Sequence, residues 1–282
     1  IIDSTRVLGE AGRTDDYEAA IAHATQLIGD TGTPRLFNAL RHPTTASMAQ
    51  RAELVDAERL ATDSYVRERG LPNALIRYAS QLFVIRLLQG RLDELVDLFV
   101  DATERTSGVA TMQAATAYML CDLGRFDEAR VAFPFTRESI EGFPDDFAWT
   151  VGVKCVAHCI AALGEADLAE VLYDKMFPHR HLFANSFFIL TGSLEQNLGQ
   201  LAATMGRLDL AIDHLRAGVH ANESARATYW IAETQLDLAD ALGQRHRPAD
   251  LEERTALIAA ALQCAETHGF AGLERRINTM SR

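Results

Sequence analysis

The chain has 282 residues, of which 48% are hydrophobic and 23% charged, and its formal net charge is -12. This composition is typical of a folded protein with ample apolar material for a core. The acidic excess argues against a nucleic-acid surface, which must neutralise phosphates with lysine and arginine. No apolar run approaches the roughly 20 residues of a transmembrane helix, so we expect neither a nucleic-acid partner nor a membrane.

The cysteines favour a reducing compartment. They are scattered through predicted helices, at Cys121, Cys155, Cys159 and Cys264. This spacing does not make a dense disulfide framework, so we interpret them as reduced and the protein as cytoplasmic. The chain opens with Ile1 and Ile2 and has no signal-peptide pattern, which indicates a piece of a longer polypeptide.

Residues 1–42 have the least regular pattern and are predicted to be an irregular helical segment. A stripe at helical spacing runs from Tyr17 to Ile28, and a short helix is expected over 35–41. One longer helix is predicted from Thr44 to Arg69. We assign residues 43–282 to a single continuous domain.

A six-residue phrase recurs through this domain. It reads Gly-Arg-Leu-Asp-Leu-Ala from Gly206 to Ala211, and each copy follows one apolar helical segment and opens another. A glycine, an aspartate near the new helix start and a small residue are typical of the joint between two packed helices. The joint glycines are Gly90, Gly124, Gly164, Gly206 and Gly243, separated by 34, 40, 42 and 37 residues.

These joints predict an all-α fold of antiparallel helix pairs. Because a tetratricopeptide unit has 34 residues, we expect a tetratricopeptide-like solenoid, a right-handed superhelix of about five to six pairs. Small residues that let paired helices approach should be inaccessible to solvent, at Ala129, Ala169 and Ala211. The predicted pairs are 73–89 with 91–105, 112–123 with 125–135, 147–163 with 165–177, 187–205 with 207–224, and 228–242 with 249–268.

One run carries a resemblance to a known group. It reads Leu-Ala-Ala-Thr-Met-Gly-Arg-Leu-Asp-Leu-Ala-Ile-Asp-His-Leu over 201–215, and continues through Asn222-Glu223 and 231–239. The chain resembles, over residues 45 to 275, the C-terminal tetratricopeptide region of bacterial AAA-type or STAND-type signalling ATPases. Members carry an adenylate-cyclase or LuxR-type DNA-binding domain elsewhere. The resemblance implies a regulatory region that senses an effector or partner.

The catalytic parts of that group have no counterpart here. The sequence contains no Gly-x-x-x-x-Gly-Lys-Ser/Thr loop for a nucleotide and no recognition helix for DNA. We therefore expect a non-enzymatic sensor or interaction region. Two alternatives remain: a free-standing adaptor that binds a peptide or partner helix, and an enzyme with its active site in the solenoid cavity.

Clusters that could carry chemistry have structural explanations. Cys155, His158 and Cys159 share one helical face, but a zinc site needs a further ligand, and free cysteines are commonly core residues. Adjacent carboxylates, as at Asp145 and Asp146, fit helix starts better than acid–base catalysis. No metal, cofactor or catalytic residue is expected.

The predicted binding surface is the concave groove of the solenoid. Lys154 and His158, one turn apart, could together meet an anionic group, with Tyr118 and Trp230 as apolar walls. The ligand would be a protein or peptide partner or a small-molecule effector, and a homodimer is a further possibility. By their place in the repeat, the groove candidates are Arg77, Ser80, Tyr118, Cys121, Lys154, His158, Gln196, Gln200, Trp230, Glu233, Asp237 and Asp240.

Overall fold

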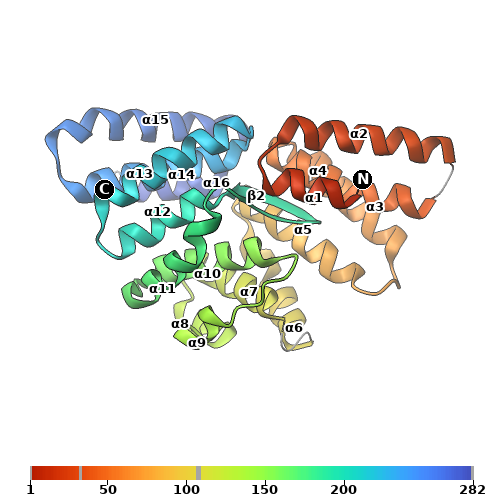
Figure 1. The fold of residues 1–282 in the computed structure, drawn as a ribbon, viewed down its shortest axis with the longest axis horizontal. Coiled ribbons are helices and arrows are strands. Elements are labelled where there is room, and N and C mark those ends of the chain that lie inside the picture. Colours follow the sequence, from red (N-terminus) through yellow and green to blue (C-terminus); the bar gives the residue numbers. More distant parts are fainter. Residues whose placement is uncertain (1, 32–33, 106–108, 281–282) are drawn as a thin grey trace.

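The computed structural model describes residues 2–31, 34–105 and 109–280, and in these ranges the protein is mostly helical, with consecutive helices packed as antiparallel pairs (Figure 1). No helix in these ranges is long and apolar enough to cross a membrane. The elements are α1 (Ile2–Glu10), α2 (Thr14–Thr31), α3 (Pro34–Gln50), α4 (Leu54–Glu68), α5 (Ala74–Gln89), η1 (Leu92–Leu95), α6 (Val96–Arg105), α7 (Ala110–Asp122), α8 (Phe126–Ala132), α9 (Arg137–Glu141), α10 (Trp149–Leu163), α11 (Ala166–Met176), η2 (Phe177–His179), β1 (Phe183–Ser186), β2 (Ile189–Ser193), α12 (Leu194–Thr204), α13 (Leu208–Ser224), α14 (Thr228–Arg245), η3 (Pro248–Asp250), α15 (Leu251–His268) and α16 (Ala271–Met280).

The predicted helix joints are present at four of the five glycines. Their φ angles of 68°, 71°, 70° and 72° lie in the left-handed region that ends a helix without steric cost for glycine, at Gly90, Gly124, Gly164 and Gly206. The small residues that follow three of these joints are each 0% exposed, as predicted, at Ala129, Ala169 and Ala211.

The fifth joint, predicted at Gly243, is wrong. Helix α14 continues to Arg245, and His246 takes the left-handed conformation with φ 53°. The extra residues place the Arg245 guanidinium 2.7 Å from carboxylate oxygens of both Asp209 and Asp250. This pairing extends the helix past its glycine.

The N-terminal segment is more regular than predicted. Helix α3 crosses the expected boundary between residues 42 and 43, so this boundary does not coincide with an element end. The single helix predicted from Thr44 to Arg69 is also wrong, because a turn at Ala52, with φ 63°, separates α3 from α4. Arg51, beside this turn, pairs with Glu18 and Glu53 and thereby ties the turn to α2.

A two-stranded antiparallel hairpin departs from the all-α prediction. Strand β2 occupies part of the segment where a helix was predicted from residue 187, and β1 lies just before that segment; both strands are buried along their length. The Thr191 hydroxyl donates to the Ala184 carbonyl at 3.0 Å. Ser193 ends the hairpin and caps α12 by accepting from the Glu195 N–H at 3.2 Å. Because the strands are held by contacts with α3 and α10, local periodicity could not predict them.

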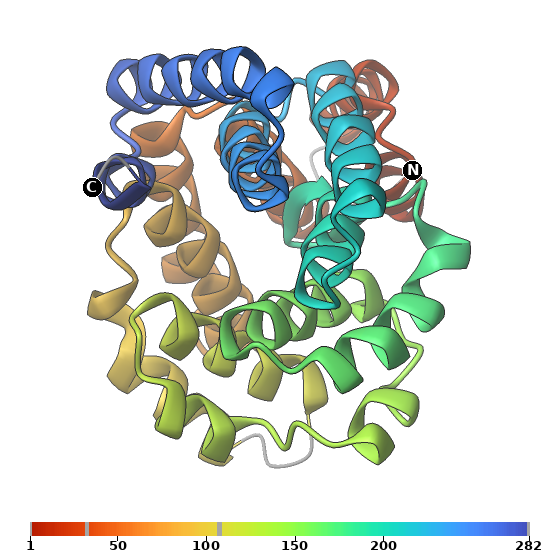
Figure 2. The same ribbon diagram turned by 90° about the vertical axis from the view of Figure 1, so that its left-hand side faces the viewer.

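The chain curves until its last helix returns to α5 (Figure 2). We call α5, α7, α10, α12, α14 and α16 the inner helices. From α7 to α16 each contacts the next, and α16 contacts α5. Phe83 of α5 meets Tyr118 of α7 with ring centroids 5.5 Å apart, which completes the circuit. The inner helices therefore surround a common space.

Two glycines allow α16 to reach α5. A Cβ atom on Gly90 would lie 3.0 Å from the Cα of Gly272 and would overlap its backbone nitrogen. The Arg275 guanidinium donates to the Gly90 carbonyl at 2.7 Å. We call this contact the glycine seam. The sequence did not predict α16, so its contact with α5 is seen only in the structure.

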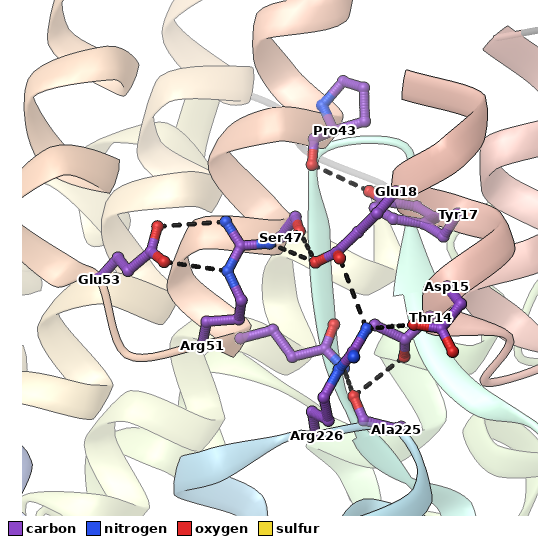
Figure 3. Close-up of polar contacts among 11 residues, drawn as sticks. Thr14, Asp15, Tyr17, Glu18, Pro43, Ser47, Arg51, Glu53, Ala225 and Arg226 are labelled. Atoms are coloured by element: carbon purple, nitrogen blue, oxygen red, sulfur yellow. Dashed lines mark hydrogen bonds and ion pairs between the residues drawn. The ribbon is translucent and has the colours of Figure 1, made fainter. Parts of the chain in front are cut away.

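A second long-range contact joins α2 and α3 to the turn between α13 and α14 (Figure 3). The Thr14 hydroxyl and the Gln50 amide both donate to the Ala225 carbonyl, at 2.9 and 2.7 Å. Arg226 also pairs with acidic side chains of α2. We call this surface the N-terminal seam, and define it by Thr14, Asp15, Glu18, Gln50, Arg51, Ala225 and Arg226.

Candidate ligand-binding cavity

The inner helices line a cavity of about 730 Å³ that is partly open to solvent. This volume lies in the range of small-molecule sites, roughly 300–1,000 Å³. Its walls come mainly from α10, α12, α14 and α16, with contributions from α5 and α7. The charged and aromatic lining residues are Asp122, His158, Tyr229, Glu233, Asp237, Asp240, Arg275 and Arg276, and Gln200, Thr204 and Gln244 are among the neutral polar ones.

Helix α14 supplies most of the acidic wall. Glu233, Asp237 and Asp240 follow one another at intervals of four and three residues, which places them on one helical face. The opposite face of α14 carries apolar side chains such as Leu238 and Leu242, which pack against α13. Packing of that face fixes the rotation of α14 and turns its carboxylates toward the cavity.

Two glutamines of α12 hold these carboxylates. The fully buried Gln196 amide donates to Glu233 Oε2 at 2.7 Å and to Asp237 Oδ2 at 2.9 Å. The Gln200 amide donates to the same Asp237 oxygen at 2.9 Å. Burial, followed by the charge of Asp237, raises the pKa of Glu233. The α12–α14 contact is therefore a pre-arranged polar network rather than an apolar one.

Arg276 is the ion-pair partner of the other two acids. Its guanidinium lies 2.7 Å from both Asp237 Oδ1 and Asp240 Oδ2. Because Arg276 belongs to α16, these bonds tie the closing helix to α14. The pKa of Arg276 is raised by the two carboxylates against the opposing effect of its burial. This arginine stays charged.

Lys154 lies behind the cavity wall with an exposed fraction of 5%. Its Nζ is 3.4 Å from Gln196 Oε1, 3.3 Å from Asn197 Oδ1 and 4.3 Å from the centroid of the Trp230 ring. Burial lowers the pKa of Lys154, and the carboxylate of Glu233 opposes that effect. The ammonium group is thus stabilised by amide oxygens and an aromatic face.

His158 and Tyr118 form a stacked pair at the α7–α10 side, with ring centroids 3.9 Å apart. Burial lowers the pKa of His158 to about 4, so the imidazole is neutral at pH 7. Tyr118 is 3% exposed, and its hydroxyl makes no hydrogen bond within the ranges that the structure describes. The pair gives the cavity an uncharged aromatic corner.

Asp122 is an isolated carboxylate at the end of α7. It lines the cavity, and no described residue forms a hydrogen bond or an ion pair with it. The residue is exposed, because the cavity is open to solvent here. Packing on the cavity side still raises the pKa of its carboxyl, while the positive charges of Arg275 and Arg276 act in the opposite direction. It is the one cavity acid that neither the glutamines nor Arg276 contact.

The structure brings most of the sequence-predicted residues together. Five line the cavity, namely His158, Gln200, Glu233, Asp237 and Asp240. Four support that wall from behind, namely Tyr118, Lys154, Gln196 and Trp230. Lys154 and His158, predicted to meet an anion together, differ in placement: the ammonium faces amide oxygens and Trp230, whereas the imidazole faces the cavity.

The remaining predicted residues lie elsewhere. Arg77 pairs with Glu68 at 2.7 Å, and the Ser80 hydroxyl donates to the Ile76 carbonyl at 2.9 Å. Cys121 is buried in the core and is not part of the lining. These three residues belong to α5 and α7, where the helices turn other faces toward the cavity.

Four charged or aromatic lining residues were not predicted from the sequence. Asp122 directly follows the predicted Cys121, and Tyr229 directly precedes the predicted Trp230. Arg275 and Arg276 belong to α16, whose only local signals are the helix stop at Gly269 and an apolar pair, Leu273 and Ile277, one turn apart. That pair could have indicated a short amphipathic helix.

The cavity offers charge and hydrogen bonds more than reactive groups. Among the described residues no three His, Cys, Asp or Glu side chains are grouped so as to hold a metal ion. Comparison with models of known protein families and with curated proteins gives no match. Any functional proposal therefore depends on the geometry of the cavity.

Proposed function

We propose that this chain is the sensor region of a bacterial signalling or transcriptional regulator, a tetratricopeptide-like solenoid that binds a small effector in the cavity between its inner helices. The observation that carries the proposal is the cavity itself, about 730 Å³ and lined by eight charged or aromatic side chains. Of these side chains Glu233 and Asp237 are each only 9% exposed, and burying carboxylates costs stability unless they contribute to function.

The continuous ring of inner helices favours a small effector over a partner helix. A helix with its side chains is about 10–12 Å wide and docks in an open groove. Here α16 occupies the side on which the groove would open, held by Arg276 to α14 and by the glycine seam to α5. An effector that contacts α16 and α14 together would also stabilise the docked position of α16, which gives a route from binding to an attached domain.

The test is to fill the cavity. Ala162 lines it and is exposed there, so Ala162→Trp should occupy the space, while Ala166→Trp, on the exposed start of α11, is the matched control. Both variants and the unmodified protein are equilibrated by dialysis against a metabolite extract, and retained compounds are identified by mass spectrometry. We expect a compound retained by the unmodified protein and by Ala166→Trp but lost from Ala162→Trp. Equal retention by all three, or by none, contradicts the proposal.

A further inference from the structure

The charges that face the cavity do not balance one another. Four carboxylates line it, those of Asp122, Glu233, Asp237 and Asp240, against the two guanidinium groups of Arg275 and Arg276. Arg276 is shared between Asp237 and Asp240. Arg275 donates to the Gly90 carbonyl at the rim. Asp122 and Glu233 are left without an ion-pair partner among the described residues.

The charge of Lys154 acts on Glu233 from behind the wall, but the two side chains form no ion pair. Its Nζ contacts only the amide oxygens of Gln196 and Asn197 and the ring of Trp230. In the described part of the chain no carboxylate oxygen lies within 4.0 Å of this ammonium group. The nearest polar contacts of Glu233 are neutral, the Gln196 amide at 2.7 Å and the Tyr229 hydroxyl at 3.4 Å.

The two acids without an ion pair line the same cavity as Tyr229. The Tyr229 hydroxyl donates to Glu233 Oε1 at 3.4 Å. Burial raises the pKa of Tyr229, and the charges of Glu233 and Asp122 raise it further. The cavity lining therefore holds two acids and a phenol, and no described cation forms an ion pair with them.

Aromatic faces and available volume select the kind of cation. The stacked pair of Tyr118 and His158, together with Tyr229, provides ring surfaces that stabilise an organic cation. A bare metal ion would need three or more grouped ligands, which the described residues do not offer. The space is also far larger than a single ion requires.

We propose that the cavity binds an organic cation, a protonated amine or guanidinium with an apolar body, held between Asp122 and Glu233 and against the rings of Tyr229 and His158. This inference rests on the proposed effector function and specifies the chemical class of the effector. Its charge would offset the acidic excess, and its body would fill the space next to α16.

Three probes of matched size test the sign of the charge: phenethylamine as the cation, 2-phenylethanol as the neutral analogue and 3-phenylpropanoate as the anion. Isothermal titration should show the cation binding at least tenfold more tightly than the other two. Asp122→Asn and Glu233→Gln should each weaken cation binding about tenfold. Glu266→Gln, at an exposed position on α15, should leave it unchanged. Tighter binding of the alcohol or the anion, or cation binding indifferent to both cavity variants, overturns the inference.

A tethered charge tests the inference without any probe. Ala162→Lys should place an ammonium group in the cavity and Ala162→Glu a further carboxylate, with the same two changes at exposed Ala260 of α15 as the control. We expect a melting temperature several degrees higher for Ala162→Lys than for Ala162→Glu, and no such gap at Ala260. The reverse order at Ala162 overturns the inference.

The two proposals fail in different ways. Retention of a neutral or anionic compound from the extract, lost on Ala162→Trp, would keep the effector function and reject the cation. Retention of no compound, together with equal melting temperatures for the two Ala162 charge variants, would reject both.

Discussion

Ion pairs between arginine and carboxylate occur both in the N-terminal seam and in the cavity network, but in different surroundings. The cavity network is defined by Gln196, Gln200, Glu233, Asp237, Asp240 and Arg276. In the seam, Arg226 pairs with Asp15 at 2.6 Å, with side chains 52% and 89% exposed. In the cavity network, Arg276 pairs with Asp237 at 2.7 Å, with side chains 31% and 9% exposed. The distances are nearly equal, but only the second carboxylate has left water.

The difference shows that solvation, rather than geometry, decides what an ion pair contributes. Water and salt can replace the partner of an exposed charge, so an exposed pair adds little stability. A buried carboxylate that loses its partner stays unpaired, at a large cost. We therefore expect substitutions in the N-terminal seam to cost little stability. Substitutions in the cavity network, or in the glycine seam beside it, should cost more.

The largest effect is expected at the glycine seam. Gly90→Ala and Gly124→Ala both place a side chain at a left-handed position, which costs about 1 kcal/mol. Only at Gly90 would the new Cβ also overlap Gly272, whereas nothing lies within 4 Å of a Cβ at Gly124. Overpacking adds about 1–3 kcal/mol. Urea unfolding should therefore show a clearly larger loss for Gly90→Ala, and equal losses would mean that α16 does not rest on α5.

Truncation of Arg276, which is partly buried, should have the next largest effect. Arg276→Ala leaves Asp237 and Asp240 without their ion-pair partner, and we expect a loss of about 2–3 kcal/mol in the free energy of unfolding. The variant Arg276→Ala with Asp237→Asn and Asp240→Asn should recover part of that loss, because it removes the unpaired charges. A loss below about 1 kcal/mol for Arg276→Ala would mean that its ion pairs contribute no more to stability than exposed ones, which would contradict the comparison.

His158 gives the stability of the cavity region a pH dependence. The pKa of His158 is about 4 in the folded protein, below the ordinary value of about 6.5 in the unfolded chain. The unfolded state therefore binds the extra proton first, and this contribution to stability is complete above pH 6.5 and is lost as the pH falls toward 4.

The groups that act on the charged form of His158 are Asp237, which favours it, and Lys154 and Arg276, which disfavour it. His158→Phe keeps a ring against Tyr118 but removes the titration. Thermal unfolding between pH 6.5 and 4 should show a smaller drop in melting temperature for His158→Phe than for the unmodified protein. Parallel curves would contradict the buried, neutral assignment.

The smallest effect is expected at the N-terminal seam. Arg226→Ala removes the pairs with Asp15 and Glu18, and we expect a loss of at most about 1 kcal/mol that shrinks further in 1 M salt. Gln50→Leu removes the buried amide donor to Ala225 and serves as the salt-independent comparison. A loss for Arg226→Ala as large as that for Arg276→Ala would remove the distinction between the two regions.

The sequence predicted what local periodicity encodes. The joints at Gly124, Gly164 and Gly206 were found because a glycine stop and a small residue recur at fixed offsets within one helix pair. The β hairpin and the return of α16 were not found, because both depend on partners far along the chain: β1 and β2 on α3 and α10, and Gly272 on Gly90. Tertiary contacts of this kind leave little local pattern.

The same limit applies to the site. Glu233, Asp237 and Gln200 were identified because the repeat assigns each helix an inward face. Arg276 was not predicted because α16 was not predicted. Without α16, the sequence indicated an open concave groove rather than a continuous ring of helices. Lys154 was predicted to face a ligand, but the sequence contains no signal that Trp230 and two amide oxygens would hold it instead.

The central claim is that α16 docks against α5 and α14 and so completes the ring of helices that lines the cavity. Hydrogen–deuterium exchange of the α16 amides, followed by mass spectrometry in the unmodified protein, Gly90→Ala and Gly124→Ala, tests it most directly. We predict slow exchange across Ala271–Met280 in the unmodified protein and in Gly124→Ala, and fast exchange there in Gly90→Ala. Exchange of α16 at the rate of a frayed end in the unmodified protein, or at the same slow rate in all three, would contradict the account.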